Sequence, residues 1–237
     1  IYQVEDQHWW YTGMRQITIT LIASLYRDRS DLQILDAGCG TGAAMAYLSA
    51  FGAVTGCDLF TQALDFCRLR GLSCLSQATV TRLPFAAESF DLVTSFDVLY
   101  HRAVGDYQDA LVEFHRVLKP DGRVLLRLPA YNWLRSHHDD IIHTARRFTT
   151  NELRQALIAS HFAVEKLSYA NTLLFPLALG KRVAERFFSV NGSTSDIHPN
   201  PPWQDRLLAR FLFAEARWLV HWPLPFGLSV IAIGRKR

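Results

Sequence analysis

Three glycines and two aspartates near the start of the chain have the spacing of a ligand-binding loop. The stretch LDAGCGTGAA places Gly38, Gly40 and Gly42 directly after an apolar run. Glycine at these positions lets the backbone turn tightly and lets a ligand approach it closely. Asp36 stands just before the glycines, and Asp58 ends the next apolar run, sixteen residues after Gly42. These residue types predict a binding site at the ends of two neighbouring strands.

The two aspartates indicate which kind of ligand the glycine loop would hold. A carboxylate at Asp36 would repel a pyrophosphate but attract an ammonium group. A carboxylate at Asp58 can hydrogen-bond both hydroxyls of a ribose. An adenosine that carries an amino acid instead of phosphates meets both conditions, and that ligand is S-adenosylmethionine. A tight β–α turn without any ligand is the competing interpretation, because a glycine-rich turn alone is a weak signal.

A second group of residues able to do chemistry follows the fourth and fifth apolar runs. His101, in VLYHR, could orient a substrate or take a proton near neutral pH, or it could simply cap the following segment. The segment YNWLRSHHDDIIHTARR, residues 131–147, is unusually dense in His, Asp and Arg. We interpret it as a lid that contacts a substrate. Its candidate contact residues are His138, Asp139, His143 and Arg146.

The geometry expected for this lid depends on its secondary structure. If residues 138–147 are helical, Asp139, His143 and Arg146 share one face, and the aspartate could fix the tautomer of the histidine. A metal site built from His138, Asp139 and His143 is an alternative, but we expect none, since methyl transfer needs no metal. The plainest alternative is a solvated loop. On that alternative, solvation is expected of His137, Asp140 and Arg147.

The elements that must position these residues alternate along most of the chain. Strand-like apolar runs and helix-like stretches follow one another, which predicts an α/β fold with a doubly wound, mostly parallel sheet. The expected strands cover 32–38, 53–58, 73–78, 89–97, 123–129, 162–170 and 228–236. The expected helices cover 41–51, 62–70, 107–118, 150–160, 172–189 and 203–220, with Thr61, Asp106 and Thr149 as N-caps.

Three motifs together resemble one enzyme family. LDAGCGTG, LPFAAESFDLVTSFDVLYH and EFHRVLKPDGRVLLRLP are similar, in order and spacing, to motifs of the class I S-adenosylmethionine-dependent methyltransferases of the methyltransferase-11 type. The resemblance is specific over residues 32–129. It implies a seven-stranded sheet whose last strand is antiparallel, in a single domain. The expected parts are N-terminal cap helices (1–30), a cofactor-binding core (31–169), a helical insertion (170–222) and a closing strand (223–237).

The resemblance also implies roles for individual residues. The implied contacts are to the methionine part by Gly38, Gly40 and Ser95 or Phe96, to the ribose by Asp58, and to the adenine by Leu59, Ala78 and Thr79. Many relatives carry an aspartate near the last position, whereas QATV has none. Recognition of the adenine amino group is therefore the least supported of these contacts.

The stretch HWWYTGMR is similar to an aromatic segment that covers the cofactor in some relatives. Aromatic faces attract a sulfonium, and Arg15 could pair with a carboxylate. We expect ligand contacts from Tyr11 and Arg15, and plain packing is an equally good interpretation for Trp9 and Trp10.

The C-terminal third exceeds a minimal fold by two helix-like stretches. A cap or ordinary packing is the favoured interpretation, and peripheral membrane contact through 172–188 or dimerisation are the alternatives. The helix at 203–220 is expected to carry Leu207, Phe211 and Trp218 on one side and Arg206, Arg210 and Arg217 on the other.

Composition narrows the class of protein. The net charge of +3 argues against a dedicated nucleic-acid binder. The four cysteines form no CxxC pair, which favours a reduced, cytoplasmic chain. We expect a monomeric or homodimeric enzyme that transfers a methyl group to a small-molecule or lipid-like acceptor by in-line attack, with a histidine as base. A nicotinamide-dependent oxidoreductase is a second hypothesis, and it fits less well because of Asp36 and the missing YxxxK pair. The third hypothesis is a non-catalytic partner subunit that binds S-adenosylmethionine.

Overall fold

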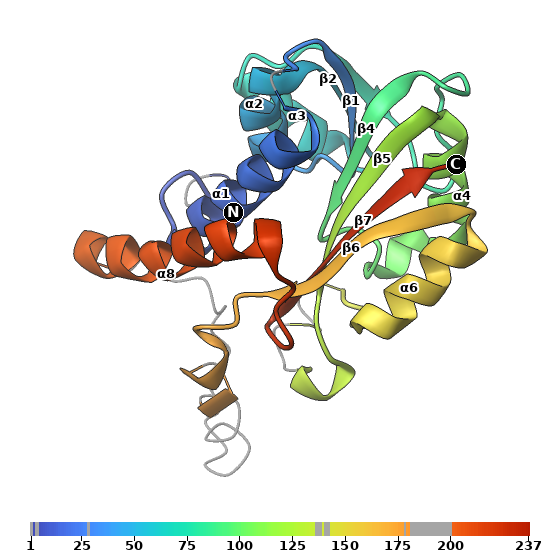
Figure 1. The fold of residues 1–237 in the computed structure, drawn as a ribbon. Helices are drawn as coiled ribbons and strands as arrows, with labels where there is room; N and C mark the ends of the chain where they lie inside the picture. Colours follow the sequence, from blue (N-terminus) through green and yellow to red (C-terminus); the bar gives the residue numbers. More distant parts are fainter. Residues whose placement is uncertain are drawn as a thin grey trace.

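A computed structural model describes residues 2, 5–27, 29–135, 139, 143–177, 179–180 and 201–237. These residues form one seven-stranded sheet in the order β3-β2-β1-β4-β5-β7-β6, with helices on both faces (Figure 1). The strands are β1 (Leu32–Ala37), β2 (Gly52–Asp58), β3 (Leu75–Gln77), β4 (Phe90–Phe96), β5 (Leu118–Pro129), β6 (Phe162–Ala170) and β7 (Ser229–Lys236).

The strand directions confirm the fold expected from the sequence. The neighbours from β3 through β5 pair in parallel, whereas β7 runs antiparallel between β5 and β6. The chain leaves β1 toward β2 on one side, and β4 lies on the other side of β1. In open α/β sheets ligands bind where the strand order reverses, which here is at the carboxyl ends of β1 and β4.

The helices begin and end where local sequence signals place them, with one exception. They are α1 (Trp9–Leu25), α2 (Ala43–Leu48), α3 (Thr61–Leu69), α4 (Tyr107–Val117), α6 (Thr150–Ala159) and α8 (Pro202–His221), and the 3-10 turns are η1 (Ser49–Phe51), η2 (Arg102–Val104) and η3 (Asn132–Leu134). Asp106 caps α4, and Thr149 and Glu152 form the predicted capping box of α6. The predicted cap at Thr61 is wrong, because Thr61 is the first residue of α3 and Phe60 holds the cap position.

Two hydrophobic clusters lie on the two faces of the sheet. One cluster joins α4 and α6 to the sheet through side chains such as Phe114 and Leu157. The other joins α1 and α8 through Met14, Ile17 and Leu212. A Cβ at Gly13 would lie 2.2 Å from Cδ1 of Leu212, so glycine is what lets these two helices cross closely. The sheet is therefore held from both sides, and its carboxyl edge is rigidly placed.

The last helix differs in one respect from the sequence expectation. Leu207, Phe211 and Trp218 do share one side of α8, but that side is exposed. The buried face consists of Ala209, Leu212, Ala216 and Leu219. At about 100° per residue, the three arginines lie next to the apolar side and not opposite to it. The expectation that the two kinds of residue occupy opposite sides is therefore wrong.

The expected helix at 172–189 is only partly within the described residues. Residues 175–177 and 179–180 are helical, and the remaining positions of its second half, including Lys181 and Arg182, lie outside them. In the part of the chain that the structure describes, no helix combines the length and apolar character needed to span a membrane.

Candidate functional site

The glycine loop has the left-handed backbone that its sequence predicts. Gly38, Gly40 and Gly42 have φ angles of +82°, +54° and +81°. A Cβ at Gly38 would lie 2.3 Å from Cγ2 of Val98, and one at Gly42 would lie 2.6 Å from Cδ1 of Leu72. A Cβ at Gly40 would meet nothing within 4 Å. Packing therefore requires the outer two glycines, and Gly40 borders the open space that a ligand would enter.

The N–H groups of this loop are already bound within the protein. The N–H groups of Gly38 and Cys39 donate to the carbonyl oxygen of Cys57 at 2.8 and 2.9 Å. The N–H of Gly40 donates to Oδ2 of Asp58 at 2.9 Å. These three donors are not presented to an anionic ligand. The loop therefore does not form the phosphate cradle of a dinucleotide site.

Asp58 is held in a fixed orientation at the end of β2. Its Oδ1 accepts the N–H of Phe60 at 2.9 Å, and its Oδ2 accepts the N–H of Gly40. Each carboxylate oxygen keeps a further lone pair that could accept from a hydroxyl. The N–H of Ala78 donates to the carbonyl oxygen of Asp58 at 3.0 Å, and the side chain of Gln77 donates to that of Leu59. The residues expected at the ribose and adenine thus lie together.

Asp36 is a buried carboxylate with one oxygen unpaired. Its side chain is only 2 % exposed, and its Oδ1 accepts the hydroxyl of Thr94 at 2.8 Å. Its Oδ2 has no partner among the described residues. Burial raises the pKa of Asp36 to about 7, with Asp58 adding to the rise and with Thr94 and Arg127 opposing it. A buried oxygen without a partner suits a cationic ligand group, so the site fits an ammonium ion.

The two candidates at the end of β4 have different environments. Ser95 is fully buried, and its hydroxyl donates to the carbonyl oxygen of Ala37 at 2.9 Å, which ties β4 to β1. Phe96 is half-buried, and the guanidinium of Arg127 lies 4.9 Å from the centre of its ring. The hydroxyl of Ser95 is therefore committed to the sheet, and Phe96 is the side chain left for a ligand.

Two residues that sequence reasoning missed lie beside Phe96. Arg127 on β5 donates to the carboxylate of Asp97 at 2.7 to 2.9 Å, and its guanidinium also lies 5.1 Å from the Trp10 ring. Asp97 has a φ of +58°, a strained backbone for a residue with a side chain. One sequence signal could have identified Arg127: it is a charged residue inside the apolar run RVLLRLP, where a buried strand is expected.

Tyr11 and Arg15 lie on the same N-terminal helix, but Tyr11 is partly buried and Arg15 is exposed. Burial raises the pKa of Tyr11 to about 12, and the nearby carboxylate of Asp97 adds to the rise. Arg15 is exposed on α1. The arginine that acts on Tyr11 is therefore Arg127 on β5. The ligand contacts expected of Tyr11 and Arg15 stay predictions, and the structure places Arg127 near Tyr11.

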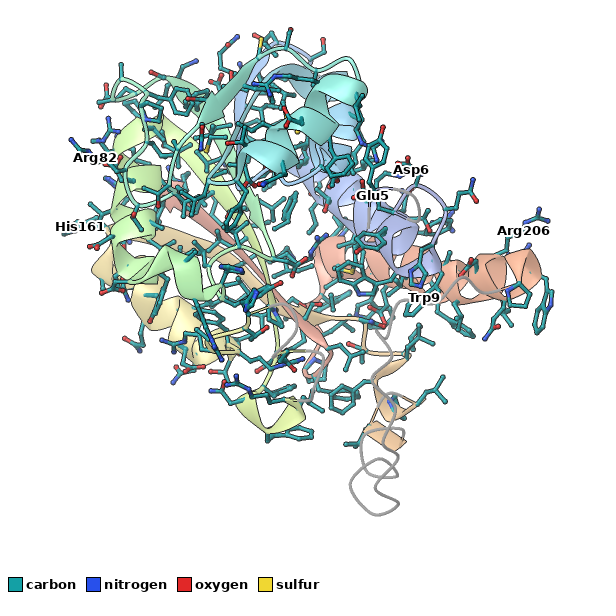
Figure 2. All side chains as sticks on the ribbon, turned by 180° about the vertical axis from the view of Figure 1, so that it is seen from behind. Glu5, Asp6, Trp9, Arg82, His161 and Arg206 are labelled. Atoms are coloured by element: carbon teal, nitrogen blue, oxygen red, sulfur yellow. The ribbon has the colours of Figure 1, made fainter. Side chains whose placement is uncertain are left out.

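The residues before α1 are attached to the glycine loop. Glu5 is buried and accepts from the hydroxyl of Thr41 at 2.5 Å and from Arg70 at 2.7 Å. Arg70 also donates to the carbonyl oxygen of Thr41 and to the carboxylate of Asp6. Figure 2 shows Glu5 and Asp6 at the start of α1, on the side of the glycine loop. The N-terminal segment thus covers one side of the site.

The two groups predicted to contact an acceptor are brought together by main-chain pairing. His101 and Thr144 form an antiparallel bridge, and the N–H of Arg102 donates to the carbonyl oxygen of His143 at 3.1 Å. The rings of His101 and His143 are consequently 5.7 Å apart. The ring of Phe60 lies 6.1 Å from that of His101. This histidine pair therefore adjoins the segment that follows Asp58.

The two histidines differ in what they can do. Nδ1 of His101 accepts the N–H of Ala103 at 3.1 Å, so His101 does cap η2. Burial lowers the pKa of His101, the neighbouring His143 lowers it further, and Asp58 partly opposes both. A neutral ring with Nδ1 accepting carries its proton on Nε2, which makes His101 a hydrogen-bond donor. His143 is exposed, with a φ of +55°.

The expected helical face of the lid is not present. Residues 143–147 are not helical, and the carboxylate of Asp139 binds Arg147 at 2.9 and 3.0 Å. Arg147 is 9 % exposed, so its expected solvation is wrong. Arg146 pairs with Glu152 at 3.1 Å and lies between two aromatic rings, away from the shared face that we expected. His137, His138 and Asp140 lie outside the described residues.

No metal site is found in the described part of the chain. Among its residues, no group of three or more His, Cys, Asp or Glu side chains is placed to hold an ion. The metal alternative included His138, which lies outside those residues. The four cysteines are free thiols, and Sγ of Cys39 lies 3.9 Å from Sγ of Cys67.

Comparisons with known proteins agree with this geometry. Residues 35–126 match the family model described as a methyltransferase domain. The chain is 31 % identical over 130 residues to demethylmenaquinone methyltransferase of Tropheryma whipplei, which covers 52 % of this chain and 48 % of the relative. It is 34 % identical over 125 residues to malonyl-[acyl-carrier protein] O-methyltransferase of Erwinia billingiae, with the same coverage. The chain thus spans about half the length of the curated relatives it matches.

A solved structure extends the likeness of fold along most of the chain. Geranyl diphosphate C-methyltransferase from Streptomyces coelicolor, in complex with Mg²⁺, geranyl diphosphate and S-adenosyl-L-homocysteine, superimposes with a TM-score of 0.61 at 17 % identity. The match covers 94 % of this chain and 78 % of that one. Over residues 35–126 the chain is therefore similar to a methyltransferase domain, and the order of its sheet agrees with that likeness.

Proposed function

We propose that this protein binds S-adenosylmethionine and transfers its methyl group to a small-molecule or lipid-like acceptor. The observation that carries the proposal is the pair of aspartates at one edge of the sheet. Asp36 offers a buried, unpaired carboxylate oxygen, and Asp58 holds a fixed carboxylate beside a glycine that borders open space. These two groups suit an ammonium ion and a ribose, and the loop between them offers no phosphate cradle.

The residues around the aspartates support the rest of the ligand. Gly38 and Gly40 provide the close backbone for the amino-acid part, and Phe96 and Tyr11 provide aromatic surface next to a sulfonium. Leu59, which is 40 % exposed, offers an apolar surface for an adenine. Ala78 and Thr79 follow on the same side, because Ala78 is hydrogen-bonded to Asp58. When bound, S-adenosylmethionine supplies an electrophilic methyl group on its sulfonium.

The histidine pair supports the transfer step. His101 would donate from Nε2 to the acceptor and orient it, since its Nδ1 is committed to Ala103. His143 would take the proton that an acceptor hydroxyl or amine loses as its atom forms the new bond to carbon. The base is therefore His143, and the role of His101 is positioning. The N-terminal segment that Glu5 and Arg70 fix would exclude water from the same edge.

The class of acceptor is inferred from relatives. Their names refer to demethylmenaquinone, to malonyl groups on an acyl-carrier protein and to geranyl diphosphate. The three names refer to small molecules or carrier-bound groups, and we therefore propose an acceptor of the small-molecule or lipid-like class. An acceptor of this class is consistent with the aromatic surface beyond β5, where the ring of Tyr131 stacks on that of Tyr169 at 4.9 Å.

Isothermal titration calorimetry with three ligands tests the proposal. We expect S-adenosylmethionine and S-adenosylhomocysteine to bind in a 1:1 ratio and NAD not to bind. The homocysteine ligand tests the adenosine and amino-acid contacts without the sulfonium charge. Binding of NAD in the absence of binding by either sulfur ligand would overturn the proposal. Transfer of a radiolabelled methyl group to small-molecule extracts would then identify the acceptor.

A further inference from the structure

The outward face of α8 carries a continuous apolar stripe. Consecutive members lie four or seven residues apart along the helix, so they line one side. They are Trp203 (67 % exposed), Leu207 (46 %), Phe211 (40 %), Trp218 (58 %) and Trp222, which directly follows the helix (65 %). Three of the five are tryptophans. A stripe of this size is unusual on a face that contacts only water.

The core does not use this stripe. The opposite face of α8 is already buried against α1, with Leu212 and Leu219 fully covered. The helix is also fixed by Glu215, which accepts the N–H groups of Asn171 and Leu173 at 2.7 Å. Figure 1 shows α8 projecting beyond the body of the domain at its N-terminal end. The stripe is thus held rigidly and faces outward.

Charge identifies what would cover the stripe. Arg206, Arg210 and Arg217 are exposed and lie along its border, and none of them forms an ion pair with a described residue. Figure 2 shows Arg206 on the projecting part of α8, away from the sheet. The two acidic residues of the helix are turned inward, since Glu215 is buried and Asp205 accepts the N–H of Trp9. The stripe and its border therefore present apolar, mostly aromatic side chains beside arginines, with both acidic residues of the helix turned away.

We propose that the outward face of α8 binds the surface of an anionic lipid bilayer. Tryptophan is favoured at the boundary between headgroups and acyl chains, and arginines beside an apolar stripe pair with anionic headgroups. The helix of 20 residues presents about 30 Å of this surface. The sequence alone suggested membrane contact through 172–188, and the structure assigns it to α8. This surface is independent of the proposed methyl transfer.

Vesicle co-sedimentation of the full chain tests the assignment. The probes are vesicles of phosphatidylcholine alone and of phosphatidylcholine mixed with phosphatidylglycerol. We expect binding to the anionic vesicles only, weakened by added salt. The triple variant R206Q/R210Q/R217Q should lower the partition coefficient about a hundredfold, since each basic residue near an anionic surface contributes roughly fivefold. The double variant W203S/W218S should lower it as well, at unchanged charge.

A matched control removes the same charge elsewhere. The variant R68Q/R82Q/R154Q changes three exposed arginines outside α8, and Figure 2 shows Arg82 on the far side of the molecule from α8. This control should keep wild-type vesicle binding. Equal binding to neutral and anionic vesicles, or no binding to either, would overturn the proposal. So would a dimer, measured by light scattering, that the α8 variants convert to monomer, because a second copy would then cover the face. Calorimetry with S-adenosylhomocysteine monitors the cofactor site separately in every variant.

Discussion

Residues 36–60 and residues 143–149 line the same edge of the sheet, but different forces fix them. In the first segment, main-chain hydrogen bonds and a single carboxylate set the geometry of the glycine loop. In the second, a buried ion pair and a capping box hold the chain in place. The hydrogen bonds that set the glycine loop all join residues within the first segment. The second depends on contacts between loops, so its geometry is more easily lost.

The difference bears on the proposed function, because the residues proposed for the cofactor and those proposed for the acceptor are held in place in different ways. The hydrogen bonds from the N–H groups of Gly38 and Cys39 to Cys57 join main-chain atoms only. Neighbouring side chains can therefore change without breaking these bonds, provided that the glycines remain. Pairs such as Asp139 with Arg147 hold one particular loop path. Replacing a pair of this kind reshapes the acceptor side without disturbing the β1–β2 edge. Four predictions test this separation.

The largest effect is expected from breaking the buried ion pair of the lid. Arg147→Leu leaves the carboxylate of Asp139, whose side chain is 1 % exposed, without its guanidinium. We expect the free energy of unfolding, measured by urea denaturation, to fall by about 3–5 kcal/mol. Arg146→Leu is the matched control, because its pair with Glu152 is about one-third exposed and such pairs contribute about 0–1 kcal/mol. Equal losses in the two variants would contradict the assignment.

The next largest effect is expected on turnover and not on the affinity for the cofactor. His143→Ala should lower turnover about a hundredfold on the acceptor that the protein methylates, the lower range for a positioned base. The affinity for S-adenosylmethionine should stay within about twofold, since His143 is exposed and its ring contact is with His101. His101→Asn takes away the Nε2–H proposed to orient the acceptor and keeps an oxygen that can accept the N–H of Ala103. It should raise KM more than it lowers kcat. Loss of cofactor binding in His143→Ala would place this histidine in the other half of the site.

The backbone geometry of the glycine loop could be predicted from the sequence, and most of the contacts made by residues 143–149 could not. Gly38, Gly40 and Asp58 act through backbone geometry that their own short motif determines. The partners of Asp139 and Arg127 come from other segments, so no local spacing reveals them. The helical face expected to join Asp139, His143 and Arg146 is not formed, because residues 143–147 are not helical and Asp139 binds Arg147. Periodicity also misjudged α8, because an apolar side of a helix predicts burial only when a partner covers it.

Asp58 allows the cofactor edge to be tested directly. Asp58→Ala removes the acceptor of the Gly40 and Phe60 N–H groups as well as the carboxylate proposed for the ribose. We expect the binding free energy of S-adenosylmethionine to weaken by about 1–3 kcal/mol. Asp65→Ala, on an exposed face of α3, is the control and should bind normally. Unchanged affinity in Asp58→Ala would remove this residue from the ribose contact.

The smallest effect, and the most specific, is the pH dependence that Asp36 should impose. Its pKa is raised to about 7 by burial, so the unliganded site is largely protonated below that pH. An ammonium group binds the ionised form, so affinity for S-adenosylmethionine should rise about tenfold as pH increases from one unit below to one unit above the pKa. Stability should move in the opposite direction. A raised carboxyl pKa favours the folded state at low pH, and this contribution is lost as pH rises through about 7. Asp36→Asn should flatten both dependences, and calorimetry and urea denaturation across this range measure them. If affinity and stability instead rise together with pH in the wild type, the buried carboxylate is not the group that meets the ammonium ion.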